Sequence, residues 1–148
     1  MILPICCAGA LLAEDLVLRA CARRGKLNGT LLGGQVRLEM LENRGMAGGA
    51  LKNRPRLARV LSCGGLLAAM ILCRGELLHG QGASCWGAAL LCAGGLGNVL
   101  ERLWRGCVTD YIRFPRLPAG RLQRLVWNLA DLMLSAGALL LAAGSISS

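Results

Sequence analysis

Two aspartates are the residues of this sequence best placed to do chemistry. Asp110 lies in a polar stretch, and Asp131 lies about one turn inside the last apolar segment, so a loop that returns to the helices could bring both carboxyls together. Two carboxyls in a low-dielectric site cannot both ionise cheaply, and such a pair shares one proton. One group is then a base that can deprotonate water and the other an acid that can protonate a scissile amide, as in aspartic proteases.

Further polar residues accompany the two aspartates. Asn128 and Asp131 are three residues apart and therefore share one helical face. A second set of polar residues, also at helical spacing, lies at the end of the third apolar segment and comprises Asn98, Glu101, Arg102 and Arg105. Spacing alone leaves two interpretations open, because membrane bundles also carry snorkelling charges at helix ends and hydrogen bonds between helices.

The composition is that of a membrane protein. The chain has 148 residues, 55% of them hydrophobic and 17% charged, with a mean hydropathy of +0.53. The 17 Lys and Arg exceed the 8 Asp and Glu by nine charges. In a polar chain this excess of positive charge would suggest nucleic-acid binding. In so apolar a chain we expect no nucleic-acid partner, and the expected partner is an anionic phospholipid surface.

The cysteines do not form a metal or disulfide pattern. The eight cysteines include no C-x-x-C pair, and the single histidine, His79, is expected at the surface of a short connection. Cys107 is close to Asp110 in sequence, but no general base accompanies it, so thiol catalysis is not expected. The sequence predicts no metal and no cofactor.

Four apolar segments predict four transmembrane helices, at residues 2–21, 57–77, 77–100 and 125–146. Small residues at four-residue spacing predict close helix contacts, through Ala89, Ala93 and Gly97 in the third segment and through Ala138 and Ala142 in the fourth.

Two polar stretches, residues 23–56 and 102–124, carry β-strand patterns. Val36, Leu38 and Met40 alternate with polar residues, and 108–114 is rich in β-branched and aromatic residues. An even number of spans places both stretches on one side of the membrane. We therefore predict a single all-α membrane domain over 1–148 with four transmembrane helices and a small β-sheet or cradle on one face. Four of the five aromatic residues are predicted to form an interfacial belt, namely Trp104, Tyr111, Phe114 and Trp127.

Motifs along nearly the whole chain resemble those of lipoprotein signal peptidases. Residues 97–112 resemble the family's GN-x-x-DR-x-x-x-G-x-V-x-D-[FY]-[IV] region. Residues 127–131, Trp-Asn-Leu-Ala-Asp, resemble its F-N-x-A-D motif, and residues 43–47, Asn-Arg-Gly-Met-Ala, resemble its N-x-G-A-A segment. Residues 15–19 resemble its D-Q-x-x-K element more weakly.

The resemblance implies an integral-membrane aspartic endopeptidase with Asp110 and Asp131 as its catalytic pair. Such enzymes remove signal peptides from diacylglyceryl-modified prolipoproteins, cutting before the lipidated cysteine. Residues that would line or support the site are Asn43, Gly45, Asn98, Glu101, Arg102 and Asn128. The resemblance also implies a monomer in the bacterial cytoplasmic (inner) membrane, with its active site near the extracytoplasmic face.

The chain departs from the family's motifs at several positions. Glu101 stands in place of Asp, Met46 in place of the first Ala, and Gly48 where an aromatic residue is usual. In the first motif, Leu16 replaces Gln and Arg19 replaces Lys. None of these changes removes Asp110 or Asp131, so they indicate a divergent member.

The distribution of basic residues conflicts with this orientation. Ten basic residues lie from Arg19 to Arg59 and six from Arg102 to Arg124, which the positive-inside rule would place in the cytoplasm. We hypothesise that these residues hold anionic head groups at the outer face. Two other functions remain open: a non-catalytic homologue that binds lipid or a partner helix, and a channel or transporter subunit that uses the two aspartates as a cation path.

Overall fold

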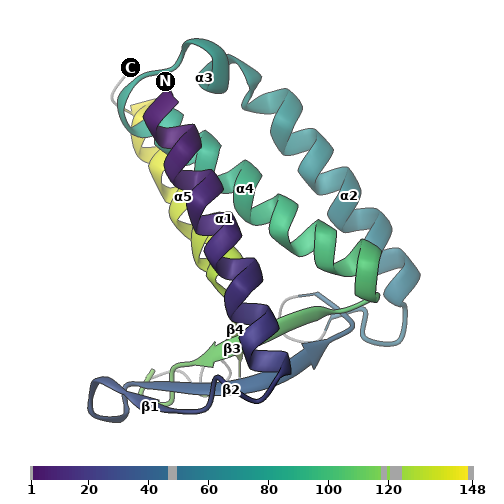
Figure 1. Cartoon of the computed structure of the whole chain (residues 1–148). Coiled ribbons are helices and arrows are strands. Elements are labelled where there is room, and N and C mark those ends of the chain that lie inside the picture. Colours follow the sequence, from purple (N-terminus) through teal and green to yellow (C-terminus); the bar gives the residue numbers. More distant parts are fainter. Residues whose placement is uncertain (1, 47–49, 118–119, 121–124, 147–148) are drawn as a thin grey trace.

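The computed structural model shows a helical bundle with a small sheet across one end (Figure 1). It describes residues 2–46, 50–117, 120 and 125–146. The helices are α1 (Ile2–Arg23), α2 (Pro55–Leu72), α3 (Arg74–His79), α4 (Gly82–Arg105) and α5 (Leu129–Ile146), and a short 3-10 turn, η1, covers Leu32–Gly34. The strands are β1 (Gly29–Leu31), β2 (Val36–Asn43), β3 (Val108–Arg113) and β4 (Val126–Trp127). Helix α4 is central, because it packs against each of the other four helices.

Within the described residues, three helices are long and apolar enough to cross a membrane, namely α2, α4 and α5. Helix α1 has 22 residues, but Glu14, Asp15, Arg19 and Arg23 make its second half more polar than a typical span. The segment predicted as one helix over 57–77 is two helices, since α2 ends at Leu72 and α3 begins at Arg74. The next helix begins at Gly82 rather than near residue 77 and continues through Arg105, so the first residues of the predicted polar stretch 102–124 are helical.

Glycines let α4 and α5 approach closely. A Cβ atom built on Gly94 would lie 2.6 Å from the Ala130 carbonyl oxygen, and one on Gly137 would lie 2.7 Å from the Leu91 backbone nitrogen. The predicted contact through Ala138 and Ala142 is wrong, because both residues are exposed. Helix α5 is apolar on every side, so its sequence could not reveal which face packs against α4.

In the other predicted stripe, Ala89 and Gly97 are buried and Ala93 is half-buried. A Cβ atom on Gly97 would lie 3.0 Å from the side chain of Leu12 in α1, so this glycine brings α1 close to α4.

Replacing Gly137 by alanine should destabilise the bundle, because the new methyl group would push α5 away from α4. We expect the free energy of unfolding to fall by about 1–3 kcal/mol, the usual cost of overpacking a core. The matched control is Gly64→Ala in α2, where nothing lies within 4 Å of an added Cβ atom. Thermal unfolding in detergent should show a lower midpoint for Gly137→Ala and an unchanged or higher one for Gly64→Ala. Equal midpoints would contradict this account of the packing.

The sheet is antiparallel, in the order β1-β2-β3-β4. The two predicted strands are β2 and β3, which pair from Asn43 opposite Val108 to Arg37 opposite Arg113. Strands β1 and β4, of three and two residues, were not predicted from the sequence because they are too short to show alternation. Strand β4 occupies the start of the predicted helix 125–146, so α5 begins only at Leu129.

The predicted aromatic belt is partly wrong. Trp104 is 91% exposed on α4, at the end of the bundle that carries the sheet, and this suits an interfacial residue. Tyr111 in β3 is instead only 1% exposed, and its hydroxyl is hydrogen-bonded inside the protein. The middle of β3 is therefore part of the core, and it positions the groups described below.

Candidate active site

Strand β3 directs Asp110 away from α1 because neighbouring residues of a strand point to opposite faces. The side chains of Thr109 and Tyr111 reach Arg23 and Asp15 on α1. Asp110, which lies between them, points the other way and is only 2% exposed. Its carboxylate accepts hydrogen bonds from Asn43 at 3.1 Å and from Asn128 at 2.7 Å.

Asp131 is held by the way in which α5 begins. Asn128 immediately precedes the helix, and its side-chain oxygen accepts a hydrogen bond from the Asp131 backbone N–H at 2.9 Å. In return, Oδ2 of Asp131 accepts the Asn128 backbone N–H at 3.3 Å. This reciprocal pair is a capping box, which satisfies two N–H groups that the first turn of a helix leaves free.

Asn128 also connects the two aspartates. Its side-chain oxygen is occupied by the cap, so its NH₂ group is free to donate to Oδ1 of Asp110. The same residue therefore contacts both carboxylates, Asp110 through its side chain and Asp131 through its backbone N–H. The structure thus brings together the two aspartates that the sequence singled out, and a single asparagine links them.

Two further asparagines have their amide orientation fixed in the same way. The oxygen of Asn43 accepts the Gly45 backbone N–H at 3.0 Å, which leaves its NH₂ group facing Asp110. The oxygen of Asn98 accepts a hydrogen bond from Nη2 of Arg19 at 2.9 Å, and its NH₂ group donates to Oδ1 of Asp131 at 2.8 Å. A guanidinium only donates, so this amide cannot reverse without losing both bonds. Three amides therefore present donors to the two carboxyls.

The environment of Asp110 favours a proton at this site. Burial, followed by the charge of Asp131, raises the pKa of Asp110 to about 6, against the opposing effect of the hydrogen bonds from Asn128 and Asn43. Asp110 therefore gains or loses its proton within the pH range where most enzymes work. Such a pair can act as an acid and a base at the same time.

A buried ionic cluster lies behind the aspartates, and sequence analysis did not identify it as part of the site. Arg19 and Asp15, both 0% exposed, pair on α1 at 2.7 Å. Oδ1 of Asp15 accepts the Tyr111 hydroxyl at 3.0 Å, and that hydroxyl accepts the Leu129 backbone N–H at 3.2 Å. The cluster therefore joins α1 to β3 and to the first residue of α5. The weak similarity of residues 15–19 to a family motif was the only signal for it in the sequence.

Glu101 connects the cluster to the sheet. Its carboxylate accepts hydrogen bonds from Arg23 at 2.8 Å and from the Thr109 backbone N–H at 2.9 Å, and Nη1 of Arg19 lies 3.7 Å away. These contacts hold the residue just before Asp110 against α4. Glu101 therefore has partners for both of its oxygens, although the related motifs have the shorter aspartate at this position.

Arg102 holds the segment that follows β2. Its guanidinium donates to the Gly45 carbonyl oxygen at 2.9 Å and to the Asn98 carbonyl oxygen at 3.4 Å. Gly45 is buried, and a Cβ atom there would collide with the Ala50 carbonyl oxygen. Among the described residues no carboxylate lies within 4 Å of Arg102, so its charge acts on the site at longer range. Ala47, in the segment that resembles N-x-G-A-A, and Gly48, which follows it, lie outside the described residues.

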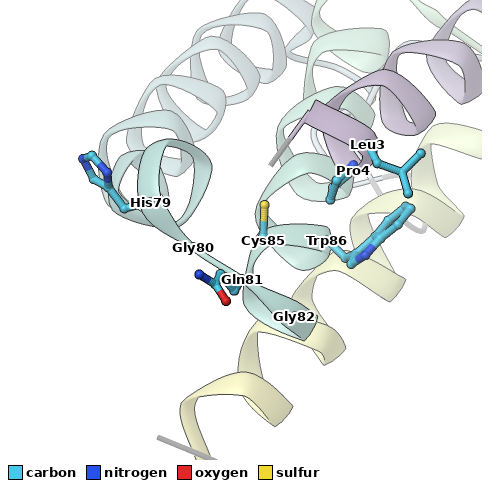
Figure 2. A pocket seen from close by; sticks show the side chains of 8 residues that line it. All are labelled: Leu3, Pro4, His79, Gly80, Gln81, Gly82, Cys85 and Trp86. Carbon is cyan, nitrogen blue, oxygen red and sulfur yellow. The ribbon is translucent and has the colours of Figure 1, made fainter.

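Cys107 and His79, the thiol and imidazole that thiol catalysis would need, lie far from each other. Burial raises the pKa of the Cys107 thiol, which disfavours the nucleophilic thiolate. His79 is exposed on α3, at the opposite end of α4 from Cys107 (Figure 1). In Figure 2 the side chain of His79 also points away from Cys85, the cysteine labelled there. In the described residues there is no group of three or more His, Cys, Asp or Glu that could hold a metal ion.

Comparisons with known proteins identify the family of this chain. The family model described as "Signal peptidase (SPase) II" matches residues 7–147. The lipoprotein signal peptidase of Caldicellulosiruptor bescii is 30% identical over 111 residues, covering 75% of this chain and 67% of that protein. The lipoprotein signal peptidase of Paraburkholderia phytofirmans is 38% identical over 81 residues, covering 52% of this chain but only 44% of that protein.

A solved structure supports the fold independently. A bacterial membrane enzyme determined by the in meso method at 2.3 Å resolution superposes with a TM-score of 0.82 at 20% identity, covering 99% of this chain and 89% of that one. At this identity the likeness concerns the fold alone, whereas the family model covers almost the whole sequence. The family model matches residues 7–147, nearly the whole sequence, so this chain belongs to the signal peptidase II family.

Proposed function

We propose that this chain is a membrane aspartic endopeptidase that removes signal peptides from diacylglyceryl-modified prolipoproteins, cutting before the lipidated cysteine. Asp110 and Asp131 are its catalytic pair. The observation that carries the proposal is the contact of Asn128 with both carboxylates, at 2.7 Å to Asp110 and 3.3 Å to Asp131. The names of the curated relatives, both lipoprotein signal peptidases, supply the substrate class.

In the proposed reaction, the pair starts with one proton. The ionised carboxylate takes a proton from water, the water oxygen bonds to the scissile carbonyl carbon, and the other carboxyl gives its proton to the carbonyl oxygen. The C–N bond then breaks as the first carboxyl gives its proton to the amine of the cysteine, while the second carboxylate takes a proton back from a hydroxyl of the diol, so the pair again holds one proton. The amides of Asn43, Asn98 and Asn128 fix the carboxyl groups, so that the pair meets the peptide without reorganising.

We propose the following membrane arrangement for this function. Helix α1 joins α2, α4 and α5 as a fourth span, because Asp15 and Arg19 are paired and face the protein interior. The sheet and both polar stretches then lie at the extracytoplasmic surface of a bacterial cytoplasmic membrane, in a single domain over residues 1–148. The basic residues of these stretches contact anionic head groups there, which explains why they break the positive-inside rule.

The proposed function requires a lipid-modified substrate. The test is to incubate the purified protein with two precursors that differ only in the diacylglyceryl group on the cysteine. Cleavage of the modified precursor alone supports the proposal. A non-catalytic lipid- or helix-binding homologue would leave both precursors intact.

Cleavage should depend on pH through the shared proton. Because burial and the charge of Asp131 raise the pKa of Asp110 to about 6, Asp110 loses its proton as pH rises through this value. We expect kcat/KM to fall above pH 6, approaching about tenfold per pH unit. Initial rates between pH 4 and pH 9, with folding checked at each pH, measure this dependence. A flat profile from pH 5 to pH 9 would contradict a shared proton.

A further inference from the structure

A cavity of about 540 Å³ lies between α1 and α4 near the sheet. Its volume is within the range of about 300–1,000 Å³ that is usual for small-molecule sites. The residues that line it are Leu16, Arg23, Leu100, Glu101, Trp104 and Arg105. We refer to it as the α1–α4 groove.

The α1–α4 groove is separate from the paired aspartates. Glu101 forms part of its wall, and the carboxylate of Glu101 lies against Arg19. Arg19 is 0% exposed and lies between Glu101 and Asn98, and Asn98 in turn contacts Asp131. The buried ionic cluster therefore lies between the groove and the proposed catalytic pair, and a ligand in the groove does not need to be the peptide substrate.

Polarity changes along the groove as it does along a phospholipid. Arg23 is the last residue of α1 and Arg105 the last of α4, so both cations lie where these helices leave the bundle. Leu16 precedes Arg23 by seven residues, which is about 10 Å along a helix, and Leu100 is also deeper in its helix than Arg105. Trp104, 91% exposed, has an indole ring suited to the interface between these zones.

Arg23 pairs with Glu101 at 2.8 Å and Arg105 with Glu42 at 2.9 Å, but additional cations beside the groove leave its surroundings positively charged. Arg23 donates hydrogen bonds to Glu101 and Thr109 through Nη1, and within the described part of the chain its Nε and Nη2 remain available. Arg24 and Lys26 follow directly, are exposed, and form no ion pair within the described part of the chain. No acidic residue occurs between Asp15 and Glu39. An anionic head group would therefore be favoured over a zwitterionic one.

We propose that the α1–α4 groove binds one anionic phospholipid of the surrounding bilayer. Its phosphate lies against Arg23 and Arg105, and the start of one acyl chain lies against Leu16 and Leu100. The head-group region contacts Trp104. This site does not depend on the proposed peptidase activity, since none of its lining residues is hydrogen-bonded to the side chain of Asp110 or Asp131 within the described part of the chain.

A second hollow provides an internal comparison. It lies at the other end of the bundle, has a volume of about 410 Å³, and is lined by residues that include Leu3, Gln81, Cys85 and Trp86 (Figure 2). No Lys, Arg, Asp or Glu lines it. We therefore expect this second hollow to show no preference for an anionic lipid.

The test is native mass spectrometry of the full chain in detergent, titrated with phosphatidylglycerol or with phosphatidylcholine that has the same acyl chains. We expect one phosphatidylglycerol to bind at least about tenfold more tightly than phosphatidylcholine, which is a difference of about 1.4 kcal/mol.

Three variants test the position of the lipid. The Arg105→Gln substitution should remove this preference. Trp104→Ala, at a side chain too exposed to affect folding, should weaken the binding of both lipids. Arg74→Gln, at the opposite end of the bundle, is the matched charge control and should bind like the wild type.

Equal affinity for the two lipids in the wild-type protein would overturn the proposal. An equal loss of preference in Arg105→Gln and Arg74→Gln would overturn it as well, because the effect would then follow net charge alone. Asp110→Asn should bind phosphatidylglycerol like the wild type, so the outcome is independent of whether the chain cleaves prolipoproteins.

Discussion

Asp110→Asn and Asp131→Asn should each lower prolipoprotein cleavage by about 10⁴-fold or more while leaving the protein folded. An asparagine keeps the size of the side chain but can neither take a proton from water nor give one to the peptide. Groups that act as a unit in catalysis lose nearly the full effect when any one is removed. Single-turnover cleavage rates measure the loss, and the double variant should be no slower than either single one.

The matched control for these variants is Glu39→Gln. Glu39 lies in β2 and pairs with Arg113 in β3, so it belongs to the same sheet without touching either aspartate. We expect its cleavage rate to stay within a fewfold of the wild type. A comparable loss in Glu39→Gln, or full activity in Asp110→Asn, would show that the aspartates are not the reacting groups.

The Asp110→Asn variant should also have a different dependence of stability on pH. The pKa of Asp110 is higher in the folded protein than in the unfolded chain, so folding favours the protonated form. This contribution is present below about pH 4 and is lost as pH rises through about 6. Thermal unfolding between these pH values should therefore show a smaller decline in Asp110→Asn than in the wild type.

The largest effect on stability should come from Arg19→Met. Arg19 is fully buried and carries hydrogen bonds to Asp15 and Asn98, with Glu101 3.7 Å away. Removing one partner of a buried ion pair leaves a buried charge without compensation, which costs about 3–5 kcal/mol. We expect a correspondingly lower midpoint of thermal unfolding in detergent.

Two substitutions separate this effect from general loss of charge or volume. Arg19→Lys retains a cation beside Asp15 but not the planar fork that also reaches Asn98, so its loss should be smaller. Arg24→Met removes an exposed arginine from the same helix end and should leave stability unchanged. If Arg19→Met were as stable as Arg24→Met, the buried cluster would not hold α1 to the site.

The sequence was informative where a pattern repeats along one element. Alternating side chains predicted β2, and a run of β-branched and aromatic residues predicted β3. Long apolar runs predicted the helices, but apolar composition alone does not mark the end of α2 at Leu72 or the start of α4 at Gly82. The spacing of Asn128 and Asp131 placed them on one face, and the structure adds the reason, which is a capping box at the start of α5.

The sequence was uninformative where a contact depends on how separate elements pack. Asp15 and Arg19 could be read as charges at the end of a helix, and only the packing of α1 against β3 and α4 shows that both are buried with Tyr111. For the same reason Tyr111 could not be told from an interfacial aromatic residue, nor Gly137 from the exposed Ala138 beside it. Burial at these positions is a property of the assembled bundle.

The departures from the family's motifs fit within the described site. Glu101 in place of aspartate reaches both Arg23 and the Thr109 backbone N–H, and Arg19 in place of lysine bonds to two partners at once. The two longer side chains face each other across 3.7 Å. The site therefore accommodates both changes without loss of the contacts around Asp110 and Asp131.

The most direct test of the central claim is the mass of the products formed from a diacylglyceryl-modified prolipoprotein by the purified protein. The account predicts a free signal peptide and a second fragment that begins with the lipidated cysteine, from the wild type and from neither Asp110→Asn nor Asp131→Asn. An intact precursor after incubation with folded wild-type protein would contradict it, as would the same two fragments from either variant.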